Sequence, residues 1–386
     1  MSYNIGIDAR KLSDFGIGTY IRNLIYALSE LDQENFYTLF VGQKHQEKLL
    51  DLPDNFSTVV ERSPVYSVRE LAALSWRLFR LDLDLYHSTH YVLPAMVPCR
   101  AVVTIHDIIH LLYPEFLPSS LAFFYAQRMI RRSLARGDRI IADYQNTKTD
   151  LMEYFDVDGR KIRVIYPGVT NRFRQRLERS ALEAKLAELA LEKPYLLFVG
   201  NPKPHKNLDN VVKAYARALA ISDFDADLVC VGDRSGSEFK IRQRAEQLGI
   251  GNRVRLLGHV DDDILPAIYQ GATVFLYPTL YEGFGLPVVE AMASGVAVIT
   301  SSTSALKEVA EGYAHLVNPL DIEETAGAIA QCMTDPEHRE ALAKLGARRA
   351  EEFRWSKTAE QTHEVYMSVL QGVPARRQDQ EAGGGA

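Results

Sequence analysis

Two carboxylates flank a glycine-rich stretch in the second half of the chain, Glu282-Gly-Phe-Gly-Leu-Pro-Val-Val-Glu290. Carboxylates accept hydrogen bonds from hydroxyl groups, so this pair suits a ribose diol and a sugar. Because proline favours the first position of a helix, Pro287 predicts a helix start that leaves Glu282 in the loop and Glu290 one turn inside the helix. A glycine loop with two solvated glutamates is the alternative interpretation.

The backbone between these glutamates also has the features of an anion site. Glycine lets the main chain approach a ligand closely, and amide groups at a helix N-terminus bind phosphate. We therefore expect the four residues that follow Glu282 to contact a phosphate or a sugar hydroxyl: Gly283, Phe284, Gly285 and Leu286.

Two lysines follow the apolar run Tyr195–Val199 in the segment Gly200-Asn-Pro-Lys-Pro-His-Lys-Asn-Leu. A cation at a strand-to-helix junction opposes the helix dipole, which favours a role in binding an anion. Lys203 and Lys206 are thus candidates to neutralise a diphosphate, and an ordinary surface lysine is the alternative for Lys206.

The first half of the chain offers two weaker candidates. Gly16-Ile-Gly18 follows an expected strand at Ile5–Asp8 and predicts a loop that covers a diphosphate bound by the second domain; a flexible turn is the alternative. His106 ends the apolar strand Ala101–Ile105 and could donate a hydrogen bond to a sugar hydroxyl or order an acceptor, unless it is structural. Three further histidines are weaker candidates for the same cleft: His87, His90 and His110.

The segment Gly258-His-Val-Asp-Asp, which includes Val260 and Asp262, is where we expect a nucleotide base. A carboxylate can accept hydrogen bonds from guanine N1–H and N2–H₂, which uracil cannot match. Asp262 therefore favours a GDP-sugar over a UDP-sugar.

Short β-branched runs alternate with helical patterns along most of the chain, which is typical of parallel α/β sheets. The alternation pauses at a polar helical segment, residues 175–191, and restarts at Tyr195. We expect two Rossmann-like, doubly wound domains facing a cleft, residues 1–170 and 171–355. A helix at about 356–371 would return to the first domain, and residues 372–386 are polar enough to be disordered.

Composition excludes several classes of protein. A net charge of −6 argues against binding nucleic acid through its phosphates. The three cysteines match no metal or redox spacing, Asp82-Leu-Asp84 and Asp223–Asp227 fit structural roles, and we expect neither a metal nor a cofactor. The absence of an apolar run of about 18 residues predicts no transmembrane helix, and the N-terminus shows no signal peptide, so we expect a cytoplasmic enzyme.

One stretch suggests contact with a membrane. Leu121–Arg136 carries four arginines and no acid, interleaved with aromatic and aliphatic residues. Such a helix can lie on an anionic membrane surface, and a core helix with an ordinary solvated face is the alternative.

Together these segments resemble glycosyltransferase family 4, of the GT-B fold, to about residue 371. Gly6-Ile-Asp-Ala-Arg10 with the Gly16–Leu24 segment looks like the opening of the lipopolysaccharide and O-antigen mannosyltransferase branch. Further segments stand in family order, and the last is the most specific: Ile105-His-Asp107, Tyr166-Pro-Gly-Val169, His205-Lys-Asn-Leu208, Gly258-His-Val260 and the glutamate pair eight residues apart.

The resemblance implies a hexosyltransferase with Glu282 beside the donor sugar, Glu290 on the ribose and Lys206 on the diphosphate. His106 would reach the transferred sugar, and amides of Gly16–Gly18 would complete the phosphate contacts. It further implies retention of anomeric configuration without a metal, a nucleotide-sugar donor such as GDP-mannose, and a lipid-linked glycan acceptor.

Two positions depart from the family pattern. His205 stands where many relatives have arginine, and Tyr144-Gln-Asn-Thr147 replaces a usual serine. A UDP- or dTDP-sugar transferase, a sugar-nucleotide epimerase, a synthase with a soluble acceptor and a non-catalytic binding protein remain as alternatives.

Overall fold

The computed structural model describes residues 2–43, 49, 51–117, 119–191, 193–232 and 238–372. The chain divides into two compact units: one extends to Gly168 and resumes at Trp355, and the other comprises Val169–Arg354. These limits lie beside those expected from the sequence. The expected disordered tail, apart from Gly372, lies outside the described residues.

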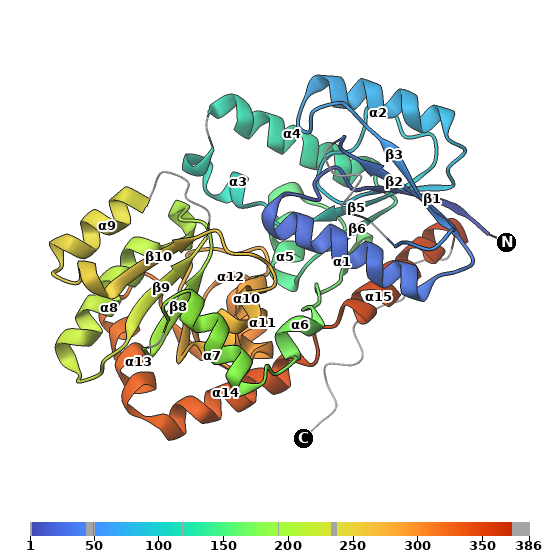
Figure 1. Cartoon of the computed structure of the whole chain (residues 1–386). Helices are drawn as coiled ribbons and strands as arrows, with labels where there is room; N and C mark the ends of the chain where they lie inside the picture. The colour runs from blue at the N-terminus through green and yellow to red at the C-terminus, as the bar shows by residue number, and fades with distance from the viewer. Residues whose placement is uncertain are drawn as a thin grey trace, which may run out of the picture. The chain divides into compact units, whose positions relative to one another are not determined.

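The first unit is built on a seven-stranded parallel sheet in the order β3-β2-β1-β4-β5-β6-β7 (Figure 1). The strand order reverses direction between β1 and β4, and ligands of such sheets bind at the carboxyl ends of the strands near that point. The strands are β1 (Asn4–Asp8), β2 (Phe36–Val41), β3 (Phe56–Val60), β4 (Leu85–Ser88), β5 (Arg100–Ile105), β6 (Arg139–Ala142) and β7 (Ile162–Val164).

Alternate residues of these strands enter two hydrophobic cores, one on each face of the sheet. In β5, Val102 belongs to one core and Val103 to the other, as the two-residue repeat of a strand requires. Helices supply the other half of each core: α1 (Phe15–Leu31) and α15 (Trp355–Leu370) on one face, and α2 (Val68–Arg80), α4 (Ser120–Arg136) and α5 (Gln145–Phe155) on the other.

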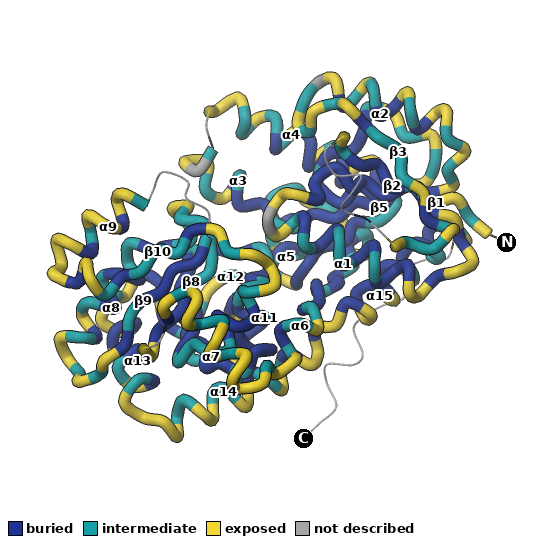
Figure 2. Tube along the Cα trace, viewed as in Figure 1, coloured by how far each residue is buried: buried dark blue, intermediate teal, exposed yellow. Residues whose placement is uncertain are grey.

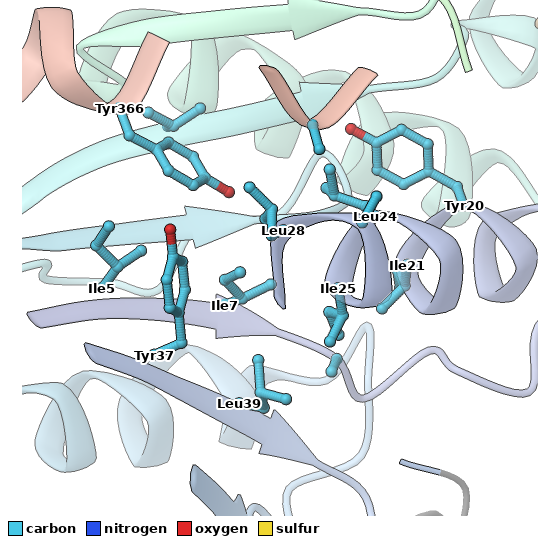
Figure 3. Close-up of a cluster of buried hydrophobic side chains, with 14 of the residues drawn as sticks. Ile5, Ile7, Tyr20, Ile21, Leu24, Ile25, Leu28, Tyr37, Leu39 and Tyr366 are labelled. Atoms are coloured by element: carbon cyan, nitrogen blue, oxygen red, sulfur yellow. The ribbon is translucent and has the colours of Figure 1, made fainter. Parts of the chain in front are cut away.

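Helix α15 is integral to the first unit although it comes last in the described chain. It lies along α1 in Figure 1, and its buried Tyr366 enters the core together with side chains of α1 and of β1 and β2, as Figure 3 shows. Full burial of each large apolar side chain stabilises the fold by about 1.5–3 kcal/mol. The expectation that the last helix packs on the first domain is thus confirmed.

The second unit has a six-stranded parallel sheet in the order β10-β9-β8-β11-β12-β13. Its strands are buried and the outer faces of its helices are exposed (Figure 2). The strands are β8 (Tyr195–Val199), β9 (Asp227–Val231), β10 (Val254–Gly258), β11 (Val274–Tyr277), β12 (Ala297–Ser301) and β13 (His315–Val317).

The helices of the second unit include the polar segment that separates the two strand-helix series in the sequence. That segment folds as α7 (Arg179–Glu188), which packs against α10 (Leu265–Gly271), so it is part of the second unit. The remaining helices of this unit are α6 (Asn171–Arg174), α8 (Leu208–Ile221), α9 (Glu238–Gln247), α11 (Leu286–Ala293), α12 (Ser304–Ala310), α13 (Ile322–Thr334) and α14 (Pro336–Ala350).

Candidate functional site

The second unit brings Lys206 and Glu282 into direct contact. Lys206 ends the short helix η4 (Pro204–Lys206) after β8, and Glu282 follows β11, the neighbouring strand. The Lys206 ammonium lies 2.7 and 2.9 Å from the two carboxylate oxygens of Glu282 and 2.9 Å from the hydroxyl of Tyr277. The sequence motifs predicted that Lys206 and Glu282 belong to one site. They did not indicate Tyr277, because it belongs to an apolar strand and resembles a core residue.

The local backbone holds these two loops together. Asn207 adopts a left-handed conformation with φ of 60°, and its side-chain amide donates to the carbonyls of Pro278 and Pro319. The amide of Leu280 donates to the carbonyl of His205. The loops after β8 and β11 are therefore fastened to each other by main-chain acceptors, which fixes the lysine and the glutamate.

The charge state of Lys206 follows from these contacts. Burial alone disfavours an ammonium ion, but the Glu282 carboxylate and the Tyr277 hydroxyl raise the pKa of Lys206 above its ordinary value. Burial and the adjacent carboxylate also raise the pKa of Tyr277. Lys206 is consequently a fixed cation at neutral pH, as neutralisation of a phosphate requires.

The glycine-rich stretch forms the expected helix start. Helix α11 begins at Leu286 with a proline in its first two positions, and Gly285 precedes it at φ of 89°. A side chain at Gly285 would overlap Leu306, so glycine is required there for conformation and for space. Within the first turn of α11 the Leu286 amide begins the helix, Pro287 has no N–H, and the Val288 amide donates to the Gly285 carbonyl, so an anion here would meet the amides up to Leu286.

Phe284 has a second role in this stretch. Its side chain is buried and meets the ring of Phe353 edge to face, with ring centroids 5.5 Å apart. The ring therefore anchors the loop in the hydrophobic interior, and only its backbone is placed to meet a ligand.

Glu290 lies inside α11 and receives a hydrogen bond of 2.9 Å from the hydroxyl of Tyr269. Burial raises the pKa of Glu290 to about 7, against the opposing effects of Tyr269 and of the Arg172 cation. Arg172 lies 3.5 Å from Asp262, a further carboxylate that raises the pKa of Glu290. Tyr269 and Arg172 were not identified from the sequence, because a tyrosine in a helix and an arginine before α7 carry no motif.

A hollow opens at the carboxyl ends of β8, β9 and β10. Its lining includes Gly200, Pro202, Cys230, Gly232 and Gly258. Val260 is partly buried just beyond it, and the exposed Asp262 forms an ion pair with Arg172. An aromatic base in this region would meet mostly backbone and apolar atoms, while Asp262 would have to exchange one partner to bind it.

Lys203, the other lysine of this region, precedes η4 at its N-cap position and is exposed. Lys206, in contrast, is mostly shielded from solvent, because its ammonium group contacts the buried side chains of Tyr277 and Glu282. The structure thus separates the two lysines that the sequence treats alike.

In the first unit, His106 directly follows β5 (Arg100–Ile105), and both of its ring nitrogens have a hydrogen-bond partner. Nδ1 lies 2.7 Å from the carboxylate of Asp143, and Nε2 lies 3.0 Å from the carbonyl oxygen of Thr89. Both partners are acceptors only, so the two nitrogens must both donate and the ring is an imidazolium. Burial of the His106 ring disfavours the cation, but the Asp143 carboxylate outweighs this effect and the pKa of His106 is raised.

His106 can therefore donate a hydrogen bond to a sugar only if its hydrogen bond to Asp143 or to Thr89 breaks. A ring that donates to Thr89 has no further N–H group for a sugar hydroxyl. Asp143, which follows β6 on the neighbouring strand, was not identified from the sequence; its place after an apolar strand was the available signal.

The Gly16–Gly18 segment is not the loop that the sequence predicts. It forms the first turn of α1, where the amide of Gly18 donates to the carbonyl of Asp14. A side chain at Gly18 would overlap the Leu12 carbonyl, whereas the space around Gly16 is open. The partial glycine pattern was misleading because helix-forming residues follow it directly. Amides at this helix start can still face a phosphate.

The remaining histidine candidates of the first unit lie inside it. His87 is buried between the hydroxyls of Tyr366 and Thr104, and burial lowers its pKa to about 3, so it is a neutral core residue. His90 is buried beside an ion-pair cluster in which Arg10 bridges Asp8 and Glu70, with nitrogen-oxygen distances of 2.5 and 2.6 Å. His110 is partly buried in a short helix, α3 (Ile109–Leu112).

The stretch Leu121–Arg136 folds as helix α4, and its arginines divide into two groups. Arg132 and Arg136 donate to main-chain carbonyls in the segment at Pro94 and Ala95. Arg128 and Arg131 are exposed. Leu121 and Phe124 are also exposed, by 78% and 62%, on a helix whose other face is buried in the core.

Two family models match the chain along most of its length. Residues 16–172 match Glycosyltransferase Family 4, and residues 182–349 match Glycosyl transferases group 1. The chain belongs to these glycosyltransferases, and its two parallel-sheet domains are those of the GT-B fold. The expected class of enzyme, a hexosyltransferase of family 4 type, is confirmed.

Curated relatives and a solved structure agree with this assignment. The chain is 25% identical to O-antigen chain mannosyltransferase B of Escherichia coli, over 91% of this chain and 95% of that one. It is 28% identical to O-antigen chain mannosyltransferase RfbU of Salmonella typhimurium, over 63% of each chain. The structure of sucrose-phosphate synthase from Thermosynechococcus elongatus matches with a TM-score of 0.79 and 21% identity, over 96% of this chain and 100% of that one.

None of the helices within the described residues combines the length and the apolar content that crossing a bilayer demands.

Proposed function

We propose that this enzyme transfers mannose from GDP-mannose to a hydroxyl group of a growing, lipid-linked glycan of the cell surface, with retention of anomeric configuration. The observation that carries the donor chemistry is the Lys206–Glu282 pair beside the start of α11. The choice of mannose is supported by the mannosyltransferases named above.

In this proposal the protein acts mainly through electrostatics. As the glycosidic bond breaks, negative charge develops on the nucleoside diphosphate, and fixed donors stabilise that charge. Lys206 and the backbone amides of Phe284–Leu286, at the start of α11, supply them. Glu282 keeps Lys206 in place and accepts a hydrogen bond from a donor-sugar hydroxyl, while Glu290 accepts from the ribose.

Retention follows in the proposal from attack on the same face that the diphosphate leaves. The leaving phosphate oxygen accepts the proton of the acceptor hydroxyl as the new glycosidic bond forms. This step uses no protein nucleophile, and we propose that turnover needs neither a metal ion nor a cofactor.

The donor proposal is tested by thermal shift with GDP, GDP-mannose, UDP, UDP-glucose and dTDP-glucose. A ligand that binds only the native state raises the melting temperature. Selective stabilisation by GDP and GDP-mannose is expected, and selective stabilisation by UDP or dTDP compounds would overturn the choice of base. Turnover that is unchanged in excess EDTA is expected as well.

A donor-only assay separates transfer from epimerisation. An epimerase releases free sugar or an isomer without any acceptor, whereas the proposed transferase consumes GDP-mannose rapidly only with a lipid-linked glycan. Proton NMR of the product distinguishes a retained from an inverted anomer. Rapid isomerisation in the absence of acceptor would contradict the transferase proposal.

We also propose peripheral contact with the cytoplasmic face of a membrane through α4. The exposed Leu121 and Phe124 and the exposed Arg128 and Arg131 suit an anionic bilayer surface. Sedimentation with vesicles of anionic phospholipid tests this, with Leu121→Ser/Phe124→Ser expected to bind more weakly. Phe239→Ser is a matched control, because Phe239 is 72% exposed on α9 in the other unit. Equal binding by both variants would refute the role of α4.

A further inference from the structure

Three potential metal ligands meet in the second unit, away from the donor residues. They are His315 at the first position of β13, Cys332 in α13 and His338 in α14. One ligand atom from each residue lies within 4.8 Å of the other two. The rings of the two histidines meet edge to face, with centroids 5.7 Å apart.

The fold brings these residues together through a tight corner. Asp335 alone separates α13 from α14, and its carboxylate caps α14 by accepting from the amide of His338. Cys332 and His338 therefore face each other across the corner. His315 approaches from β13, the edge strand of the sheet, which is paired with β12.

An unsatisfied polar atom points to a ligand at this position. Nε2 of His338 is buried and has no hydrogen-bond partner within the described part of the chain. A buried polar atom without a partner costs free energy, on the order of 1–3 kcal/mol. Cys332 is fully buried and is a free thiol.

We propose that His315, Cys332 and His338 form a binding site for a borderline-soft divalent cation, with Zn²⁺ the best fit. Two imidazole nitrogens and one thiolate are ligands that Zn²⁺ prefers, and three protein ligands leave a fourth tetrahedral position for water. Binding replaces the S–H bond with a Zn–S bond and releases the proton to solvent.

The three ligand atoms would need to move only slightly closer together to bind one Zn²⁺ ion. Ligand atoms in a tetrahedral zinc site are roughly 3.3–3.8 Å apart, given bond lengths of about 2.0–2.3 Å, so a small contraction is sufficient. The nearby cation Arg339 donates to the Cys332 carbonyl over 2.9 Å, which fixes its guanidinium on the main chain.

This site is distinct from the donor residues. Glu282 lies in the loop after β11, whereas His315 lies in β13, which β12 separates from β11 in the sheet. An ion there would tie β13, α13 and α14 together, and α14 packs against α11, which carries Glu290. The inference therefore concerns stability and does not depend on the proposed transfer reaction.

Cobalt titration of the tag-free, full-length protein tests the proposal. Thiolate coordination gives an intense near-ultraviolet charge-transfer band, and a tetrahedral site gives strong visible bands. One equivalent of Co²⁺ is expected to produce both, with Zn²⁺ displacing it and raising the melting temperature.

Matched variants identify the ligands. Cys332→Ser is expected to lose the charge-transfer band, and His338→Asn to weaken Zn²⁺ binding at least 10-fold. Cys99→Ser is expected to change neither, because Cys99 lies in the other unit. Circular dichroism shows which variants fold; if Cys332→Ser does not, His338→Asn at its partly buried position still decides. The absence of a thiolate band in the wild type, or its persistence in a folded Cys332→Ser, would overturn the site.

Discussion

The ammonium of Lys206 and the carboxylate of Glu282 form a bidentate pair, with nitrogen-oxygen distances of 2.7 and 2.9 Å. The exposed fractions of the two side chains are only 17% and 10%. A pair this shielded holds its charges in place before any ligand arrives, so no reorganisation is needed when charge develops on a leaving group.

Lys206→Ala and Glu282→Ala are each expected to lower kcat by roughly 100-fold to 1000-fold, the cost of removing one preorganised electrostatic contact. Each change also leaves a partner charge shielded and unpaired, which lowers the free energy of unfolding by about 3 kcal/mol. Steady-state kinetics and urea denaturation measure the two effects.

The double variant Lys206→Ala/Glu282→Ala separates the two effects. Removing both charges is expected to cost less stability than the sum of the single changes, while turnover remains lost. Lys344→Ala, at an exposed position of α14, is the control for a general loss of positive charge. Near-wild-type kcat in the single variants would reject the assignment of the site.

The pKa of Glu290, raised by burial to about 7, predicts a pH-dependent stability. An unfolded glutamate titrates near pH 4.3, so the folded state binds this proton more tightly than the unfolded state. The resulting stabilisation is complete below about pH 4.3 and is lost as pH rises through about 7. Relative to the wild type, Glu290→Gln is expected to show a flatter dependence of melting temperature between pH 5 and 8.

Calorimetry at several pH values in one ionic strength provides that comparison. Glu246→Gln, which removes a carboxylate at an exposed position of α9, is a suitable control. Parallel curves for the wild type and Glu290→Gln would show that Glu290 does not titrate in this range.

The imidazolium of His106 depends on Asp143, its partner at 2.7 Å. Asp143→Asn removes the main interaction that raises the pKa of His106, so burial is expected to lower that pKa. The stability that the raised pKa contributes is present below the unfolded value, near 6.5, and is lost as pH rises through the folded value. Asp143→Asn is therefore expected to lose stability mainly at acidic pH.

NMR titration of the His106 ring protons in the wild type and in Asp143→Asn measures the shift directly. Asp138→Asn is a control, since Asp138 lies in the same unit and pairs with the exposed Arg100. An unchanged pKa in Asp143→Asn would contradict the imidazolium assignment and reopen direct hydrogen bonding from His106 to a sugar.

Local sequence patterns predicted most strands of the two sheets but missed one edge strand of each. The central strands are continuous apolar runs because both faces are buried, as in β8 and β12. The edge strands β3 and β13 were missed because they are only partly buried and lack a continuous apolar run. At edges, pairing with a neighbour rather than local hydrophobicity decides the conformation.

The same limit applies to the site. The loop at Glu282 and the start of the following helix could be predicted from the motif, because glycine and proline act through local backbone geometry. Tyr277, Tyr269 and Asp143 could not be found in that way, because each becomes functional only through a partner distant in sequence. The cluster of His315, Cys332 and His338 is the extreme case, because its three side chains come from three elements and have no characteristic spacing.

The two glycines at the start of α1 offer a test of ligand contact that is independent of folding. Gly18→Ala is expected to destabilise the first unit because the new methyl group overlaps the Leu12 carbonyl. Gly16→Ala places its methyl group in open space, and alanine favours a helix by up to about 1 kcal/mol over glycine. Its melting temperature is thus expected to be unchanged or higher.

If the amide of Gly16 contacts the donor diphosphate, Gly16→Ala should still raise the KM for the donor by roughly 10-fold, since the methyl group blocks close approach. A stable protein with weakened donor binding is an outcome that general damage to the fold cannot produce. A Gly16→Ala enzyme with wild-type KM and kcat would mean that the start of α1 packs against the protein interior through Gly18 and takes no part in binding the diphosphate.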